Sequence, residues 1–438
     1  MPRLLKCPDR RSFLTSLGAG GVMGAGLVAG SGPVIRSVMA STTGAVRRPK
    51  VAFLGTEVRT HSHAQHFLDR HTMGYTWNGR WQAPRVDVAS VFIDQFPRSD
   101  LARSRIRELR LNQYPTIEEA LTLGGEKLAV DGVIIIGEHG QYPRNEKGQT
   151  RYPRYEWFKR VVKVFEDSGR SVPVFNDKHL STVWEECVEM VEDSRRLDFA
   201  FLAGSSLPVT RRMPAIDMPY NARLKESVCV AYGGVDSYDI HALETAQCMS
   251  DRRAGGEKGV KQIHALRGEQ LWNRLWKEDC SDTRKLIMAA VNRSHNLPVD
   301  TGFPSGPTSI EWLQKTLPGG TAYFIDHHDG LRTTMLLTGI RDFNYAGMLD
   351  DGTVISCQMY LPMPGHGSST ADFFNPLARH IETTMMEGKT PYPVERTLLT
   401  SGMVIGGVDS LFAGQSLLPT PHLNIKYSAP EQSTFWRN

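Results

Sequence analysis

A short apolar run that breaks at one glycine and continues as a helix-like segment constrains the fold of this chain most. Residues 50–54 read K-V-A-F-L, Gly55 follows, and residues 60–68 read T-H-S-H-A-Q-H-F-L. In a doubly wound α/β domain the first strand is buried on both faces and is almost entirely apolar, and the turn after it opens on the ligand crevice. The segment therefore predicts a Rossmann-like parallel sheet with residues 50–54 near its centre.

The turn after Gly55 departs from a dinucleotide-binding turn. The fingerprint G-x-G-x-x-G needs three glycines, whereas Thr56, Glu57 and Val58 follow the single one here. A carboxylate in this turn opposes a pyrophosphate, because both groups are negative. The sequence supports the fold more strongly than the cofactor.

The first 40 residues predict a twin-arginine export signal. Residues 9–15 read D-R-R-S-F-L-T, residues 16–30 are apolar and glycine-rich, and S-V-M-A ends at Ala40. The alternative is an amphipathic or membrane-spanning helix, but the apolar stretch is shorter than the ~20 residues that a span needs. We expect a soluble mature protein that is periplasmic or otherwise exported.

The balance of charge argues against two classes of partner. The chain has 51 Lys and Arg and 47 Asp and Glu, of which the leader holds five and one, so the remainder carries 46 of each sign. Nucleic acid and anionic membranes select basic surfaces, and we expect neither as a partner.

Five cysteines follow the leader and are widely spaced: Cys187, Cys229, Cys248, Cys280 and Cys357. An odd number cannot all pair within one chain. We expect buried free thiols, with one or two disulfides as the alternative.

Strand-like and helix-like segments alternate from residue 49 to residue 204. The expected strands are 50–54, 86–94, 131–137, 172–175 and 198–203, and the expected helices are 101–110, 117–123, 155–168 and 182–194. This alternation, with right-handed crossovers, gives a parallel sheet. Thr116 is the expected N-cap of the second helix.

Polar groups follow the second and third strands. Asp94 either accepts the ribose hydroxyls of a nucleotide or simply ends its strand. The segment E-H-G-Q-Y-P, Glu138–Pro143, lies at the edge where an open sheet binds ligands. Residues 71–84 form an expected insertion whose aromatic side chains, Tyr75, Trp77 and Trp81, cap a pocket.

The order of these segments resembles the glucose–fructose oxidoreductase, inositol dehydrogenase and rhizopine catabolism (Gfo/Idh/MocA) superfamily. Three motifs match: Tyr114–Leu121, Asp131–Gly137, and P-V-F-N-D-K-H at residues 173–179. The resemblance implies an N-terminal Rossmann domain, at residues 49–204, and a C-terminal α/β domain, at residues 205–438, with an open, mostly antiparallel sheet that forms a homo-oligomer interface. It also implies NAD or NADP as the cofactor, with contacts from Gly55, Thr56, Asp94, His139 and Asp177.

Lys178 takes the position of the superfamily's lysine, which is implied to contact both the nicotinamide ribose and the substrate. A lysine at the end of a central strand has an independent physical case, because desolvation lowers its pKa and lets it exchange protons. The alternative is a surface lysine in a turn.

The second half carries a further match, at A-Y-G-G-V-D-S-Y-D-I-H-A-L-E-T, residues 231–245. His241 matches the superfamily's histidine and Glu244 its trailing acid, but Ser237 stands where an acid belongs, with Asp236 and Asp239 on either side. We predict Lys178, His241 and Asp236 as catalytic residues, with His241 as a general acid–base. The alternative is a helix histidine bonded to a neighbouring acid.

Further strands are expected at 223–230, 259–268, 321–327, 333–339 and 354–360, and helices at 374–387 and 391–411. Gly402, Gly406 and Gly407 in the last helix would permit close packing against the first domain. Residues 362–369 are expected to form a loop.

Two groups of histidines raise the question of a metal: His61, His63 and His66, and His327 and His328 with Asp329. A His-x-His pair is a plausible chelate. Without a third ligand we predict no metal and expect the first group to line the crevice.

The leading functional hypothesis is an exported oxidoreductase that acts on a sugar or polyol with a tightly bound nicotinamide. One variant oxidises a sugar carbon transiently, which acidifies the neighbouring C–H and permits glycoside cleavage. The rival is a non-catalytic carbohydrate-binding protein that has lost the cofactor site, as the missing glycines and Ser237 suggest.

Overall fold

The computed structural model describes residues 47–297, 309–361 and 370–437. The predicted leader, and the predicted loop at 362–369, lie outside the described residues. A five-stranded parallel sheet has the order β4-β1-β5-β6-β7. Its strands are β1 (Lys50–Gly55), β4 (Asp87–Ile93), β5 (Gly132–Ile136), β6 (Val174–Asp177) and β7 (Phe201–Gly204). The expected strands are thus confirmed, with β1 inside the sheet.

A single parallel bridge between Val91 and Gln113 extends this sheet beyond β4. If this bridge is counted as a short strand, it and β4 lie on one side of β1, whereas β5, β6 and β7 lie on the other. The chain therefore crosses to the other side of β1 between the bridge and β5. The topological switch point therefore lies beyond the carboxyl ends of β1 and β5, where open α/β sheets bind ligands.

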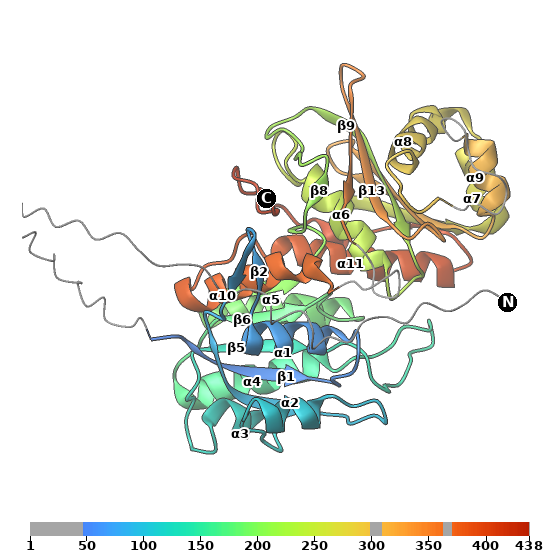
Figure 1. Ribbon diagram of the computed structural model, residues 1–438. Helices are drawn as coiled ribbons and strands as arrows, with labels where there is room; N and C mark the ends of the chain where they lie inside the picture. The colour runs from blue at the N-terminus through green and yellow to red at the C-terminus, as the bar shows by residue number, and fades with distance from the viewer. Residues whose placement is uncertain (1–46, 298–308, 362–369, 438) are drawn as a thin grey trace, which may run out of the picture. The chain divides into compact units, whose positions relative to one another are not determined.

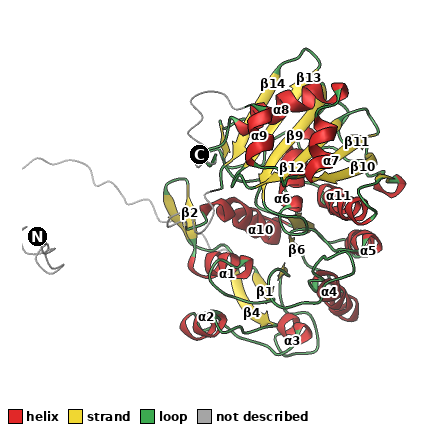
Figure 2. Ribbon diagram, turned by 90° about the vertical axis from the view of Figure 1, so that its right-hand side faces the viewer, coloured by secondary structure: helices red, strands yellow, loops and turns green. Residues whose placement is uncertain are grey.

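Helices cover both faces of the first sheet, because successive residues of β1 point to opposite sides. Ala52 and Leu54 pack on one face and Val51 and Phe53 on the other. The helices on the first face are α3 (Ile117–Thr122), α4 (Arg154–Ser168) and α5 (Trp184–Arg196). The other face packs on α1 (His63–Met73) and α10 (Asn375–Glu387), with α2 (Ala102–Glu108) nearby (Figure 2). The first sheet therefore depends on a helix from near the end of the chain.

Side-chain caps fix the starts of α3 and α1. The Thr116 hydroxyl accepts the N–H of Glu119 at 3.1 Å and confirms the expected cap of α3. Ser62 caps α1 in the same way, so this helix begins at His63.

Residues 71–84 are less irregular than the sequence suggests. Helix α1 continues to Met73, and a hairpin follows from β2 (Tyr75–Trp77) to β3 (Arg80–Gln82). Asn78 and Gly79 between the strands have φ angles of 49° and 72°. Such Asn-Gly pairs suit tight hairpin turns, because both residues tolerate positive φ.

An eight-stranded sheet follows in the order β15-β10-β11-β12-β9-β13-β14-β8. Only β9 and β12 pair in parallel among these strands, so the sheet is mostly antiparallel and confirms the expected fold class. Its strands are β8 (Arg212–Met213), β9 (Leu224–Tyr232), β10 (Val260–Arg267), β11 (Thr321–His327), β12 (Arg332–Thr338), β13 (Phe343–Leu349), β14 (Val354–Met359) and β15 (Leu417–Pro419).

Both faces of this second sheet are covered (Figures 1 and 2). One face packs on α6 (Asp239–Ser250) and α11 (Glu395–Phe412), and the other on α7 (Gly268–Leu275), α8 (Ser281–Val291) and α9 (Ile310–Thr316). Short 3-10 turns occupy Glu278–Cys280, Asp372–Phe374 and Pro421–Leu423. The face that the resemblance assigns to an oligomer interface is thus packed on helices of this same chain, and the oligomeric state stays a prediction.

Helix α11 packs on both halves, as its glycines predict. A Cβ at Gly402 would approach Trp184 of α5 to 2.8 Å, whereas Gly406 and Gly407 lie against Ile263 and Tyr323 of the second sheet. The expected contact with the first half is confirmed at Gly402 alone of the three.

The five cysteines in the described ranges are buried and unpaired, in agreement with the expected free thiols. None of the helices in the described ranges is both long and apolar enough to cross a membrane.

Candidate functional site

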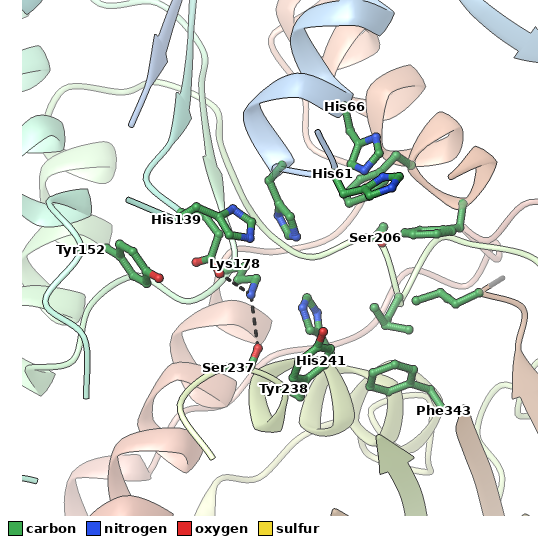
Figure 3. Close-up of a pocket in the computed structure, with 16 residues that line it drawn as sticks. His61, His66, His139, Tyr152, Lys178, Ser206, Ser237, Tyr238, His241 and Phe343 are labelled. Atoms are coloured by element: carbon green, nitrogen blue, oxygen red, sulfur yellow. Dashed lines mark hydrogen bonds and ion pairs between the residues drawn. The ribbon is translucent and has the colours of Figure 1, made fainter. Parts of the chain in front are cut away.

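A cavity of about 340 Å³ lies at the carboxyl edge of the first sheet, where the two halves of the chain meet (Figure 3). Residues that follow β1, β5, β6 and β7 form one side, and the start of α6 and a residue of β13 form another. The lining residues are His61, His63, His66, Glu138, His139, Tyr152, Lys178, Ser206, Leu207, Ser237, Tyr238, His241, Phe343, Leu361, Phe373 and Phe374. The volume suits a small polar ligand better than a dinucleotide.

A buried ion-pair network forms part of the cavity wall. Glu138 accepts from Lys178 Nζ at 2.7 Å and from the Arg154 guanidinium at 2.6 Å. Burial alone would raise the pKa of Glu138, but the Lys178 ammonium and the Arg154 guanidinium outweigh it and hold this pKa well below its ordinary value. Glu138 is therefore a carboxylate that keeps Lys178 in place.

The backbone at Lys178 explains how its side chain reaches the cavity. Lys178 follows the last residue of β6 and has a φ of 65°, and its N–H donates to the Gly204 carbonyl at the end of β7. Its ammonium donates to the Ser237 carbonyl, at 3.2 Å, as well as to Glu138 (Figure 3). A left-handed residue other than glycine is costly, and such strain is concentrated at functional sites.

Three of the imidazoles around the cavity, those of His66, His139 and His241, are held neutral. Burial and the nearby Lys178 ammonium keep the pKa of His241 well below its ordinary value. Burial lowers the pKa of His139 to about 3, although Glu138 acts in the opposite direction. Burial also lowers the pKa of His66, with Arg70 adding to the effect. Neutral imidazoles can both donate and accept hydrogen bonds, as a polyhydroxylated ligand requires.

Of the predicted catalytic and cofactor-binding residues, Lys178, His241 and His139 line the cavity. Lys178 and His241 come from different halves of the chain, and the structure brings them to one site. Their catalytic or binding roles remain predictions.

The other predicted site residues lie outside the cavity lining. Asp236 accepts the N–H of Thr150 at 2.8 Å, and Asp94 accepts the Tyr142 hydroxyl at 2.6 Å. The Thr56 hydroxyl donates to the Glu138 carbonyl, and Gly55 fits closely beneath Ala64 of α1. Asp177 accepts from Nδ1 of His63 at 2.6 Å.

The expected aromatic cap is found at a neighbouring cavity. Tyr75 and Trp81 line a second cavity of about 690 Å³, which shares His61 and His66 with the first. Trp77 instead stacks on Trp436, with ring centroids 5.1 Å apart.

The histidine groups do not assemble a metal centre. No set of three or more His, Cys, Asp or Glu side chains within the described ranges is arranged to hold a metal ion. His327 is buried and bonded to Glu257 and Thr333, and Asp329 pairs with Arg253. His61, His63 and His66 line the cavity, as the sequence predicts.

Sequence reasoning missed Arg154 and the partnership between His63 and Asp177. Arg154 begins α4 in a stretch of polar residues, and its burial at 1% exposure has no sequence signal. His63 belongs to a group that the sequence singles out, but its carboxylate partner is 114 residues away.

Solved structures share this fold at low sequence identity. The chain matches GenD2 from gentamicin A biosynthesis, solved in complex with NAD, with a TM-score of 0.53 and 11% identity over 90% of this chain and 99% of that one. Myo-inositol dehydrogenase from Lactobacillus casei, with NAD(H) and myo-inositol, matches with a TM-score of 0.53 and 11% identity over 85% and 97%. A probable dehydrogenase from Thermotoga maritima gives 0.51 and 10% over 85% and 99%. The chain therefore shares the fold of these solved structures.

No protein-family model matches the sequence. No curated protein matches it either.

The residues at the switch point do not fit the dinucleotide that this fold implies. Glu57 is 6% exposed and pairs with Arg59 at 2.6 Å, so a carboxylate side chain fills the turn where a dinucleotide fold needs bare backbone. Gln95, after β4, exchanges two hydrogen bonds with the backbone of Gln141, at 2.9 and 3.1 Å. Because β1 lies between β4 and β5, residues 138–142 cross its carboxyl end and occupy the crevice.

Proposed function

We propose that the cavity binds a sugar or cyclic polyol that carries a carbonyl group, and that the protein catalyses proton transfer at the carbon beside that carbonyl. One observation supports this most. An ammonium has three N–H donors. Lys178 uses one on Glu138 and one on the Ser237 carbonyl, which leaves one for an oxygen in the cavity.

The lining supports the class of ligand. Neutral imidazoles and the hydroxyls of Tyr152 and Tyr238 offer hydrogen bonds to hydroxyl groups, while Phe343 and Phe374 offer apolar faces to C–H groups. The likeness to a structure that holds myo-inositol is consistent with a cyclic polyol.

The chemistry needs no redox cofactor. A hydrogen bond from Lys178 to the carbonyl oxygen stabilises the negative charge that develops when the neighbouring carbon loses its proton. The proton leaves to a base, the C–H electron pair forms the C=C bond of an enolate, the carbonyl pair moves to the oxygen, and reprotonation at carbon gives the product. Such a step is also the proton-transfer part of the glycoside-cleaving reaction considered above.

A nicotinamide-dependent sugar or polyol oxidoreductase is the second candidate. The fold shared with two NAD complexes favours it. The occupation of the crevice by residues 138–142 argues against it. To decide between the two candidates, the purified protein is denatured and the supernatant is assayed for NAD(P).

The test of the first candidate is hydrogen exchange in D₂O. D-glucose, D-fructose and an inosose are incubated with the protein, and ¹H NMR follows the C–H signal next to the carbonyl. Loss of that signal on at least one compound, at a rate proportional to protein concentration, is expected. Exchange no faster than in buffer on all three overturns the proposal.

We also propose that the protein is exported by the twin-arginine route. The motif at residues 9–15 supports this. A folded-export route suits a protein whose site is assembled from both halves of the chain.

A further inference from the structure

His63 and Asp177 form a hydrogen-bonded pair at the cavity. Nδ1 of His63 lies 2.6 Å from Oδ2 of Asp177. We infer that His63, positioned by Asp177, is the catalytic acid–base that moves the proton in the cavity. This inference rests on the proposed function and names the base that its reaction needs.

The pair has a defined polarity. A carboxylate only accepts, so Nδ1 of His63 carries the hydrogen and, in the neutral ring, Nε2 is the atom able to take a proton. The Asp177 side chain is 1% exposed and that of His63 14%. His63 lines the cavity, so its proton-accepting edge is available to a ligand there while its partner is shielded from water.

Packing fixes the ring as well. The rings of Phe374 and His63 meet edge to face with centroids 5.1 Å apart, and the ring of His139 lies at 5.5 Å. His63 is also the first residue of α1, whose preceding turn is held by the Ser62 cap. A catalytic group needs this kind of fixed orientation.

The other cavity imidazoles are less suited to the task. Nδ1 of His139 and Nδ1 of His241 are buried without hydrogen-bond partners. The low pKa of each makes it a weak base near neutral pH. Of the histidines in the described cavity lining, His63 alone is hydrogen-bonded to a carboxylate.

The end of β6 places the two reacting groups together. Asp177 points towards α1, and Lys178, turned by its left-handed backbone, points to Glu138. Consecutive residues thus hold the base and the carbonyl-binding ammonium at one cavity. In the step, Nε2 takes the proton from carbon, the C–H pair moves into the new C=C bond, and the carbonyl pair moves to the oxygen that faces Lys178. Return of the proton to carbon restores neutral His63.

The D₂O exchange assay tests this with three variants. His63→Gln removes the base, Asp177→Asn keeps the shape of the partner but removes its charge, and His328→Gln is the matched control on an exposed residue of the β11–β12 turn. We expect exchange to fall on the order of 10²–10⁴-fold in His63→Gln, with KM little changed. We expect a smaller fall in kcat for Asp177→Asn and no fall for His328→Gln.

Two further measurements separate catalysis from structure. Added imidazole should restore part of the exchange in His63→Ala, which a structural role would not allow. In ¹⁵N NMR of wild-type protein, His63 should be protonated at Nδ1, and Asp177→Asn should lose that preference, whether or not any substrate turns over.

Failure of this inference can be distinguished from failure of the proposed function. Wild-type protein that exchanges while His63→Gln exchanges equally overturns the inference and leaves the proposed function standing. Protein inactive on all three carbonyl compounds overturns the proposed function. Protonation of His63 at Nε2 overturns the pairing with Asp177 independently of turnover.

Discussion

The Tyr142 hydroxyl donates to Oδ2 of Asp94 at 2.6 Å and joins the segment after β5 to the end of β4. Asp94 is the acid that a nucleotide-binding reading assigns to the ribose. Its hydrogen bond to Tyr142 means that one oxygen of this carboxylate is already used within the chain.

We therefore expect the purified protein to release no NAD or NADP when it is denatured. We also expect the protein to leave the fluorescence of NADH unchanged, at NADH concentrations up to the millimolar range. The variant Glu57→Gly with Tyr142→Phe removes the carboxylate from the turn and frees Asp94, so it should gain measurable affinity. Stoichiometric nucleotide in the wild-type protein would contradict this reading.

Lys178→Met should abolish exchange and also lower stability. It removes one of the two cations bonded to buried Glu138, and because Arg154 remains, the cost should be less than the ~3–5 kcal/mol of leaving a buried charge unpaired. Lys178→Met with Glu138→Gln also leaves the buried Arg154 guanidinium without its carboxylate, so it should lower the melting temperature further. Exchange should stay ~10²–10⁴-fold below wild type in both variants. Wild-type exchange in the double variant would remove Lys178 from the mechanism.

Glu244 should make the protein less stable as pH rises. It is fully buried, and burial raises its pKa from 4.5 to about 7, against the lowering effect of its hydrogen bonds from Ser205. Between these values the folded protein holds a proton that the unfolded chain releases, so the free energy of unfolding falls as pH increases.

Glu244→Gln should accordingly gain about 3 kcal/mol over wild type above pH ~7 and almost nothing below pH ~4. Urea unfolding across this range measures the difference. Glu387→Gln, at an exposed position of α10, is the control, and its free energy of unfolding should follow that of the wild type at every pH. A constant difference between Glu244→Gln and wild type at every pH would refute the assignment.

Gly407→Ala should destabilise the junction of α11 with the second sheet. Alanine favours a helix over glycine by ~1 kcal/mol, but the added Cβ would overlap the buried ring of Tyr323, and overpacking costs about 1–3 kcal/mol. Gly319→Ala, where a Cβ meets nothing within 4 Å, should be near neutral. Equal melting temperatures for the two variants would show that Tyr323 yields without cost.

Replacing Arg10 and Arg11 with lysine should retain the protein in the cytoplasm, because the export route reads the arginine pair rather than its charge. Cell fractionation and immunoblotting measure this. Arg3→Lys is the control and should leave export unchanged. Normal export of the double variant would argue for another signal.

The first half was predictable from sequence because its strands are continuous apolar runs that alternate with helix-like segments. The second half was less so. Strand β13, F-N-Y-A-G-M-L, has a glycine in its interior, which weakens a strand pattern. A side chain at this position would crowd its neighbours, since a Cβ at Gly347 would approach Met218 to 3.0 Å. Helices α7 to α9 are not among the elements predicted from the sequence.

Within the site, Lys178 and His241 were identified from motifs, whereas Arg154 and the partnership of His63 with Asp177 were not. Those two features depend on side chains that meet only in three dimensions. The spacing of residues along the sequence does not indicate contacts between side chains that are far apart in the chain.

The packing of α10 on the first sheet has a consequence for synthesis of the protein. Arg70 of α1 bonds to Asn375, 305 residues later. At 5–20 residues per second, the apolar face formed by Val51, Phe53 and Phe67 waits on the order of tens of seconds for its cover. During that interval the nascent chain exposes this apolar surface, so we expect cytoplasmic chaperones to bind it until α10 has been synthesised. We also expect a fragment that ends before α10 to aggregate.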